Sequence, residues 1–347
     1  MEQKFLQDDF AFAEADLDRM SLELVPGNSF LKDVFLRFKK NKGALIAMVL
    51  IVIIILLALF GPYINEDRYD TLDMARASML PKVPLIEKLG IMDGKKELPA
   101  GFDANGNKKF RTVDVYEQKK IDRYFLFGTD VMGRDLWTRT WVGTRVSLYM
   151  AFLAMLIDII IGMAYGLISG YFGGKVDLIM QRIVEILNGI PNLVIVTLLV
   201  LIMKPGILSI TIALVIKGWI GMSQVVRAQV LKLKEQEFIL ASITLGTSKK
   251  NVILKEILPN IFGQVIIMSM FSIPNAIFTE SFLAFIGLGL QAPMASLGVL
   301  INDGFKSFLV HPYMVTIPTV VLAILMLSFN IMADGLRDAF DPKMKEA

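Results

Sequence analysis

The sequence predicts an all-α polytopic membrane protein with six transmembrane helices. First, 54% of the 347 residues are hydrophobic and the mean hydropathy is +0.58, which is too apolar for a water-soluble domain of this length. Second, the apolar residues form separate blocks, and a helix needs roughly 20 such residues to cross the hydrocarbon core of a bilayer. Third, basic residues cluster beside these blocks, as they do where they set membrane topology.

The clearest apolar block is the first, which contains the unbroken run LIAMVLIVIIILLALF. The fourth block is short and carries Lys217, while Pro274 and Pro318 lie inside the last two. Proline is tolerated in a membrane helix where neighbouring helices satisfy the freed carbonyl, so neither proline excludes a span. The predicted spans are residues 44–64, 146–169, 184–203, 207–222, 261–286 and 315–333.

The short loops and tails indicate the orientation, because cytoplasmic loops are enriched in Lys and Arg. Basic residues crowd the entrance to the first span, the connection between the fourth and fifth spans, and the stretch after the sixth. The two short loops on the opposite side hold only Lys204 and Lys306. The predicted divisions are a cytoplasmic N-terminal segment (1–43), the first transmembrane helix (44–64), an extracytoplasmic loop (65–143), a core with five transmembrane helices (144–333) that includes a cytoplasmic connection (223–260), and a cytoplasmic tail (334–347).

Two segments outside the spans also carry a pattern. In the predicted outer loop, turn signals at Asp103–Gly106 and weak alternation over Lys109–Val115 favour a β-hairpin within a small folded excursion. Before the first span, residues 30–38 place apolar side chains at helical spacing against basic ones. That stretch is either an interfacial amphipathic helix or a solvated helical lead-in.

The segment from Glu237 to Pro259, EFILASITLGTSKKNVILKEILP, lies between the fourth and fifth spans. On a helix, the small side chains of Ala241 and Ser242 let a partner surface approach the backbone closely. Gly246 suits the left-handed conformation at which a helix ends, because it has no Cβ to clash. The pattern predicts a first helix that stops at a glycine elbow.

A second helix is predicted after this elbow. Thr247 or Ser248 can cap it, and Val252 and Ile257 belong to an apolar stripe along it. Pro259 fits the first turn of the following span, where its missing N–H costs nothing. The result is a helix–elbow–helix platform at the membrane surface. An ordinary amphipathic cytoplasmic loop accounts for the same spacing.

Glu237, the Ala241-Ser242 pair, Gly246 and the sequence Ile257-Leu258-Pro259 resemble the "EAA" loop of binding-protein-dependent ABC importer permeases. Ser242 stands at the second small position, where the family pattern has alanine. Residues 127–135, FGTDVMGRD, are similar to the GTD-x-x-GRD signature of the oligopeptide, dipeptide and nickel permease group. Further segments similar to the "C" subunit of that group are residues 280–289 and 330–342. The resemblance covers about residues 35–342, although the outer loop is longer than the group leads us to expect.

The resemblance implies a MetI-like ABC importer permease fold in the bacterial plasma membrane, multi-pass with both termini cytoplasmic. It implies a non-catalytic subunit that works with a second permease subunit, two ATPase subunits, an extracytoplasmic peptide-binding protein and membrane lipid, and with no nucleic acid. ATP and Mg would be bound by the ATPase subunits, so no cofactor or metal is expected on this chain. In the family the EAA loop is a coupling helix that docks into a groove on the ATPase. The expected ATPase-coupling residues are Glu237, Phe238, Ala241, Ser242, Leu245, Gly246 and Pro259.

Residues 127–135 can also serve purely local structural roles. Thr129 or Asp130 can cap a helix, and Arg134 can pair with Asp130 or Asp135. A role in fixing the fold at the outer mouth is favoured over contact with substrate. Residues 334–335, Asp-Gly, predict the end of the sixth helix.

Three charged residues, Asp158, Lys217 and Glu280, lie within or at the edges of apolar spans, where burial is costly and partners are expected. Asp158 and Glu280 are candidates for the translocation path or its gate. The alternative is that such charges pair with each other or with the second permease subunit for assembly. Lys217 is expected to snorkel or to contact a neighbouring helix.

Other functional classes find less support in the sequence. There is no G-x-x-x-x-G-K-[ST] phosphate loop, so an ATP-driven mechanism requires other chains for hydrolysis. A membrane-embedded hydrolase lacks a serine–histidine pair or a multi-histidine metal site, because His311 is the single histidine. An ion-coupled secondary transporter usually shows inverted repeats, and none is evident.

The substrate class follows from the resemblance, which favours oligopeptides, with nickel or another small solute as the alternative. A path for bare cations should offer histidine or carboxylate ligands, and the predicted spans are poor in both. A wide, weakly binding path suits peptides, whose recognition falls largely to the separate binding protein.

Overall fold

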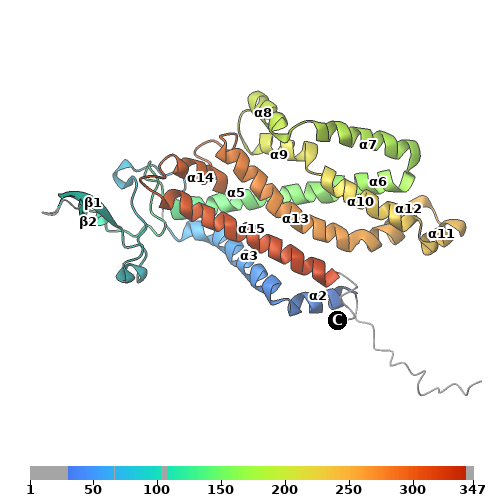
Figure 1. Cartoon of the computed structure of the whole chain (residues 1–347), viewed down its shortest axis with the longest axis horizontal. Coiled ribbons are helices and arrows are strands. Elements are labelled where there is room, and N and C mark those ends of the chain that lie inside the picture. Colours follow the sequence, from blue (N-terminus) through green and yellow to red (C-terminus); the bar gives the residue numbers. More distant parts are fainter. Residues whose placement is uncertain (1–29, 66, 103–107, 341–347) are drawn as a thin grey trace, which may run out of the picture.

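The computed structural model describes residues 30–65, 67–102 and 108–340 of the chain, and in these residues helices dominate. Figure 1 shows an elongated helical bundle with a β-hairpin at one end and α11 at the other. The helices of the bundle are α2 (Phe30–Lys40), α3 (Lys42–Phe60), α5 (Leu136–Ile157), α6 (Met163–Phe172), α7 (Gly174–Gly189), α8 (Asn192–Met203), α9 (Ile207–Lys217), α10 (Ile220–Lys234), α11 (Glu237–Thr244), α12 (Lys249–Asn251), α13 (Leu258–Phe285), α14 (Leu297–Phe305) and α15 (Tyr313–Phe340).

Among the described residues, five helical stretches are long and apolar enough to cross a membrane, or six if one bent pair counts as a single span. The predicted spans all fall on these stretches, so the fold class is confirmed. The helices are longer than predicted. The stretches are Lys42–Tyr63, Leu136–Phe172, Ile207–Lys234, Lys249–Phe285 and Tyr313–Phe340, with Gly174–Gly189 and Asn192–Met203 as the bent pair.

The third predicted span, residues 184–203, is bent and is not a single straight helix. Helices α7 and α8 meet at 77°, and Pro191 lies in the break. Ile190 is extended, with φ −88° and ψ 123°. A residue before proline is disfavoured in the α region, so the helix ends here although the hydropathy continues.

The loop between α3 and α5 contains the predicted hairpin. Strands β1 (Lys95–Phe102) and β2 (Lys108–Asp114) pair antiparallel, with a register shift between Pro99 and Gly101. The predicted turn at residues 103–106 lies outside the described residues. The short helix α4 (Val115–Lys119) follows β2, and its buried Tyr116 donates a hydrogen bond to the Leu80 carbonyl at 2.7 Å. Burial raises the pKa of the Tyr116 phenol, which stays protonated and anchors the hairpin.

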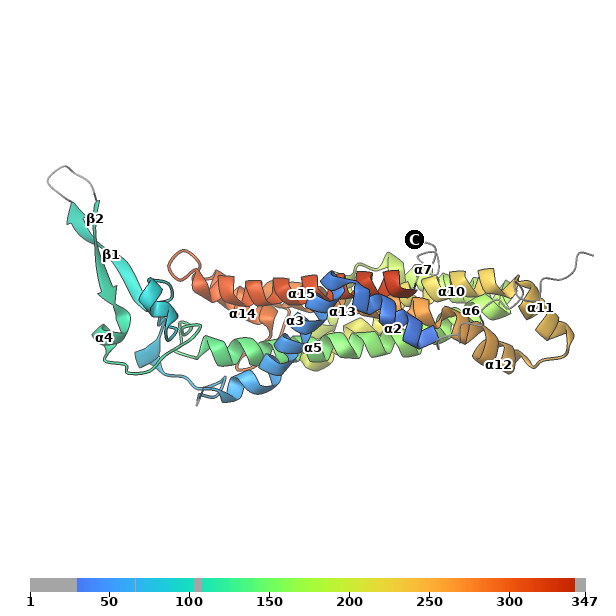
Figure 2. The same cartoon turned by 90° about the horizontal axis from the view of Figure 1, so that it is seen from below.

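The two views agree on which elements share an end of the bundle. The hairpin lies at one end, whereas α11 and α12 lie at the other, and α2 and the end of α15 are in the α11 half (Figures 1 and 2). Helix α2 packs Val34 and Phe38 against the last turns of α15. Residues 1–29 and 341–347, which include most of the predicted N-terminal segment and half of the tail, lie outside the described residues.

Helix α15 does not end at residues 334–335 as predicted, but continues to Phe340. Gly335 lies inside the helix, where an added Cβ would be 2.3 Å from the Cβ of Ala44 on α3. The glycine therefore serves close helix–helix packing, the usual use of small residues between membrane helices, and not helix termination.

Gly335→Ala should weaken the packing of α3 on α15. The added methyl meets Ala44, and overpacking of this kind costs about 1–3 kcal/mol. Gly221→Ala in α10 is the matched control, because its added Cβ meets nothing within 4 Å while the gain in helix propensity is the same. We expect a lower thermal-unfolding midpoint for Gly335→Ala only. Equal midpoints for the two variants would contradict the close contact.

Candidate functional site

The segment from Glu237 to Pro259, called the platform below, folds as two helical pieces joined by a glycine elbow. Helix α11 ends at Thr244, and Gly246 adopts φ +85°, the left-handed conformation predicted for it. The chain turns at Ser248 into α12 and the π-helical segment η6 (Val252–Ile257). Ile239 of α11 is fully buried in the same apolar cluster as Val252 and Ile257, so the two pieces are packed together.

The other apolar side chains in and just after α11 are exposed. Leu245 is 87% exposed, and Phe238, Leu240 and Ile243 are each at least 41% exposed. Ala241 is exposed among them, so the backbone of α11 is accessible from this side. The small residue and the apolar neighbours form a surface suited to a partner that approaches closely.

A partly buried polar contact holds the elbow closed. The Ser242 hydroxyl lies 2.9 Å from Thr247 Oγ1 and donates to Glu256 Oε1. Ser248 occupies the N-cap position of α12, one of the two positions predicted, but its side chain makes no cap hydrogen bond. Glu256 was missed in the sequence, because its partner is a hydroxyl 14 residues away across a turn.

The platform continues without a break into α13. Pro259 lies in the first turn of α13, as predicted, and residues 249–285 as a whole form one helical stretch. The π-helical η6 precedes this proline, and Leu258 N donates to the Ile253 carbonyl. Proline has no N–H, so one backbone hydrogen bond of a regular α-helix is missing here. The π-helical turn gives the neighbouring backbone groups other partners, and the helix stays continuous.

The three intramembrane charges do not pair with one another. Asp158 Oδ2 accepts a hydrogen bond from Ser272 of α13, and Lys217 Nζ donates to the Ile190 carbonyl at 2.7 Å. Glu280 is buried, and its Oε2 accepts from Ser147 of α5 at 3.0 Å. The two carboxyl groups thus join the α5 helix and its π-helical continuation η5 (Asp158–Gly162) to α13 at two levels. Lys217 contacts the neighbouring segment, as expected.

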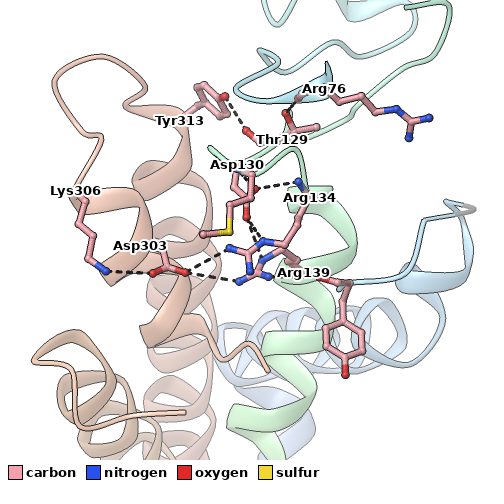
Figure 3. A network of polar contacts seen from close by, with 10 residues as sticks. Arg76, Thr129, Asp130, Arg134, Arg139, Asp303, Lys306 and Tyr313 are labelled. Atoms are coloured by element: carbon pink, nitrogen blue, oxygen red, sulfur yellow. Dashed lines mark hydrogen bonds and ion pairs between the residues drawn. The ribbon is translucent and has the colours of Figure 1, made fainter. Parts of the chain in front are cut away.

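A second polar cluster, called the Asp130 network, lies near the start of α5 (Figure 3). Asp130 Oδ2 is 2.6 Å from Arg134 Nε and 3.7 Å from Arg139 Nε. The two guanidinium groups also reach Asp303 of α14, at 3.8 and 3.7 Å. Asp303 in turn lies 3.4 Å from Lys306 Nζ. The network therefore ties α14 to the loop before α5.

The residues around Asp130 only partly follow the predicted local roles. Arg134 pairs with Asp130, as predicted, but the cap of α5 is Asp135 and neither Thr129 nor Asp130. Thr129 Oγ1 instead accepts from Met79 N at 2.8 Å and donates to the Arg76 carbonyl. Sequence reasoning missed Arg139 and Asp303. The signal for Arg139 was a charge in the apolar stretch just upstream of the predicted second span.

These features define a polytopic helical membrane protein that presents a rigid apolar platform beyond one end of its spans. Residues 162–346 match the family of binding-protein-dependent transport system inner membrane components, and residues 29–81 match the N-terminal transmembrane domain of oligopeptide transport permease C. The chain belongs to this family of binding-protein-dependent transport permeases.

Relatives match over nearly the full length. The dipeptide transport system permease protein DppC of Lactococcus lactis subsp. cremoris (strain MG1363) is 42% identical over 92% of this chain and 93% of its own. The oligopeptide transport system permease protein OppC of Bacillus subtilis (strain 168) is 37% identical over 92% of this chain and 91% of its own. A chain of the MetNI methionine ABC transporter, solved in inward-facing conformations, is 16% identical, covers 57% of this chain and 94% of its own, and gives a TM-score of 0.47.

Asp130→Asn should destabilise the chain far more than Asp303→Asn. Asp130 is buried with both arginines, and breaking a buried ion pair costs about 3–5 kcal/mol. Asp303 is 39% exposed, so losing its charge should cost at most about 1 kcal/mol. The thermal-unfolding midpoints of the two purified variants show which substitution destabilises the chain more. A lower midpoint for Asp303→Asn than for Asp130→Asn would contradict the assignment of Asp130 as the centre of the network.

Proposed function

We propose that the chain is the transmembrane permease subunit of an ATP-driven, binding-protein-dependent importer of oligopeptides. The observation that carries the proposal is the platform: an exposed apolar face on α11 is fixed to a helix that runs unbroken from Lys249 to Phe285. A partner that moves this face moves α13 as well. The family and the full-length relatives supply the class of machine in which such a partner exists.

The proposed orientation places both termini and the platform in the cytoplasm and the hairpin outside. The basic residues beside the platform favour a cytoplasmic location. The positions of the hairpin and α11 at opposite ends of the bundle support it, since a membrane between them separates the two (Figure 2).

In the proposed mechanism, closure of an ATPase dimer pushes the platform, and the push travels along α13. The bonds of Ser272 to Asp158 and of Ser147 to Glu280 couple α13 to α5, so the two helices tilt together. We place Asp158 and Glu280 in the gate, as ties between moving helices. Tilting opens the path to the outside, and hydrolysis returns the inward-open state.

The proposed assembly contains a second permease subunit, two ATPase subunits and an extracytoplasmic peptide-binding protein. This chain is non-catalytic and binds no cofactor of its own, with ATP and Mg held by the ATPase subunits. Peptides are favoured over nickel as the substrate, because the relatives are named for dipeptide and oligopeptide transport. The expected ATPase-contacting residues are those of the platform.

Leu245→Cys tests the docking surface. The chain has no native cysteine, so the new thiol is unique, and its side chain is 87% exposed on the platform. We expect it to crosslink to a co-purified ATPase subunit. Leu309→Cys is the matched control, because that leucine is 96% exposed but follows α14, and α14 lies in the hairpin half of the bundle, away from α11 (Figure 2). Crosslinking of Leu309→Cys to the ATPase, or of neither variant, would refute the proposed docking.

Deleting the gene for this chain from its host tests the substrate class. Uptake of labelled dipeptides and oligopeptides should fall to background, and expression of the intact chain should restore it. Nickel uptake, measured in the same cells, should not change. Loss of nickel uptake with peptide uptake preserved would replace the peptide assignment with the metal alternative.

A further inference from the structure

A lateral cleft of about 480 Å³ opens between α3, α5, α13 and α15. The cleft is lined almost wholly by apolar side chains. Ile51 and Ala58 lie at its buried side, while Leu59, Tyr149 and Phe152 at its edge are exposed. The cleft lies within membrane-spanning helices, so its open side faces the hydrocarbon or another membrane chain. Its volume falls in the roughly 300–1,000 Å³ range of small-molecule sites.

One cation, Arg145, stands at the end of this cleft. Its guanidinium donates to the Ala58 carbonyl at 2.9 and 3.1 Å and to the Leu59 carbonyl at 3.2 Å. Within the described part of the chain, no carboxylate lies at ion-pair distance from Arg145. A charge in a membrane helix normally has a counter-charge, so Arg145 presents an unneutralised cation beside an apolar cleft.

Arg145 also lines a second, polar cavity of about 410 Å³ next to the end of α3. Arg68 and Asp67 lie in this cavity, and Asp67 is already paired with Arg76 at 3.2 Å and Arg123 at 3.0 Å. Arg68 pairs with Asp70 at 3.3 Å. Among the described residues that line this cavity, Asp67 and Arg68 are thus paired with other groups, and Arg145 is the cation without an ion-pair partner where the cavity meets the cleft.

Aromatic residues place this junction at the level of the lipid headgroups. Tyr63 is exposed just after α3, and Trp137 Nε1 donates to the Gly61 carbonyl at 2.8 Å. Trp and Tyr concentrate at the boundary between hydrocarbon and water. Arg145 thus lies where a headgroup phosphate sits, with an acyl-sized cleft on its hydrocarbon side and a polar cavity on its water side.

We propose that this pair of cavities is a specific site for an anionic phospholipid. One acyl chain lies in the cleft, the phosphate pairs with Arg145, and the headgroup occupies the polar cavity. The bound lipid supplies the missing counter-charge and fills the space between α3 and α5. It thereby fastens the first span to the core, at a place distinct from the platform and from the Asp130 network.

The test uses the transporter assembled from this chain and its co-expressed partner subunits, purified in a mild detergent. Native mass spectrometry counts bound phosphatidylglycerol and, separately, zwitterionic phosphatidylcholine. The intact chain should prefer phosphatidylglycerol. Arg145→Gln should weaken binding of phosphatidylglycerol about fivefold, because one surface cation contributes about that much to anionic-lipid binding. Binding of phosphatidylcholine should fall by less, because its choline cation already offsets the phosphate that Arg145 contacts. Lys204→Gln, an exposed cation remote from the cleft, should change neither.

Two further variants keep the test decisive if Arg145→Gln fails to assemble. Arg145→Lys retains the charge and should retain the preference for phosphatidylglycerol. Ile55→Trp fills the cleft from its edge and should reduce binding of both lipids. Unchanged phosphatidylglycerol binding in Ile55→Trp and Arg145→Gln would overturn the proposal. So would an efficient crosslink from Phe152→Cys to the second permease subunit, since the cleft would then be a protein interface. These outcomes concern lipid alone and leave the assignment of transport untouched.

Discussion

The structure depends on one constraint: polar groups inside an apolar bundle must find their partners within the protein, because water is absent there. Helix α5 and its π-helical continuation carry several of these groups, among them Arg139, Ser147 and Asp158. Their partners come from α13 and α14, namely Ser272, Glu280 and Asp303. Asp158 and Glu280 are buried, so the bonds that set the position of α13 are costly to break, whereas the partly exposed Asp303 ties α14 more weakly. The apolar contacts fill the space between.

The same constraint lets the platform transmit a displacement to the helices of the bundle. The stretch from Lys249 to Phe285 has 37 residues, which at 1.5 Å per residue is about 55 Å of helix. The hydrocarbon core is about 30 Å thick, so the helix extends well beyond it. One end of this helix carries the platform and the other end holds Glu280 in its buried bond to α5. A displacement at the platform is thus delivered to the helix pair and is not absorbed by a flexible loop.

The sequence predicted the helical class, the spans and the glycine elbow, because each rests on composition or on a local conformation. It did not predict the bend at Pro191, since hydropathy measures apolar content and not the direction of a helix axis. It missed Arg139 and Arg145 for a related reason: the predicted span began at Val146, where the charges stop. The helix in fact begins at Leu136, and the two arginines are accommodated by Asp130, Asp303 and backbone carbonyls.

Gly335 shows a different limit. A glycine near the predicted end of a helix suits a terminus equally well as a close contact, and only the position of Ala44 distinguishes the two. The Ser242–Glu256 contact is similar, since nothing local in the sequence links a serine to a glutamate on the far side of an elbow. The roles of these residues depend on side chains that are near them only in the folded structure. A single sequence does not show which side chains those are.

The platform differs from the rest of the bundle because one side of it packs against the protein while its outer side remains exposed. Ile239 faces inward and is fully buried, whereas Leu245 and Phe238 on the outer face remain exposed. Each square ångström of such apolar surface favours burial by about 25 cal/mol, so the free face stores a driving force for docking. The inner face is rigid because Ser242, Glu256 and the apolar cluster hold it. A rigid base under an unsatisfied apolar face is what force transfer from a separate chain requires, because docking then moves the helix and does not reshape the loop.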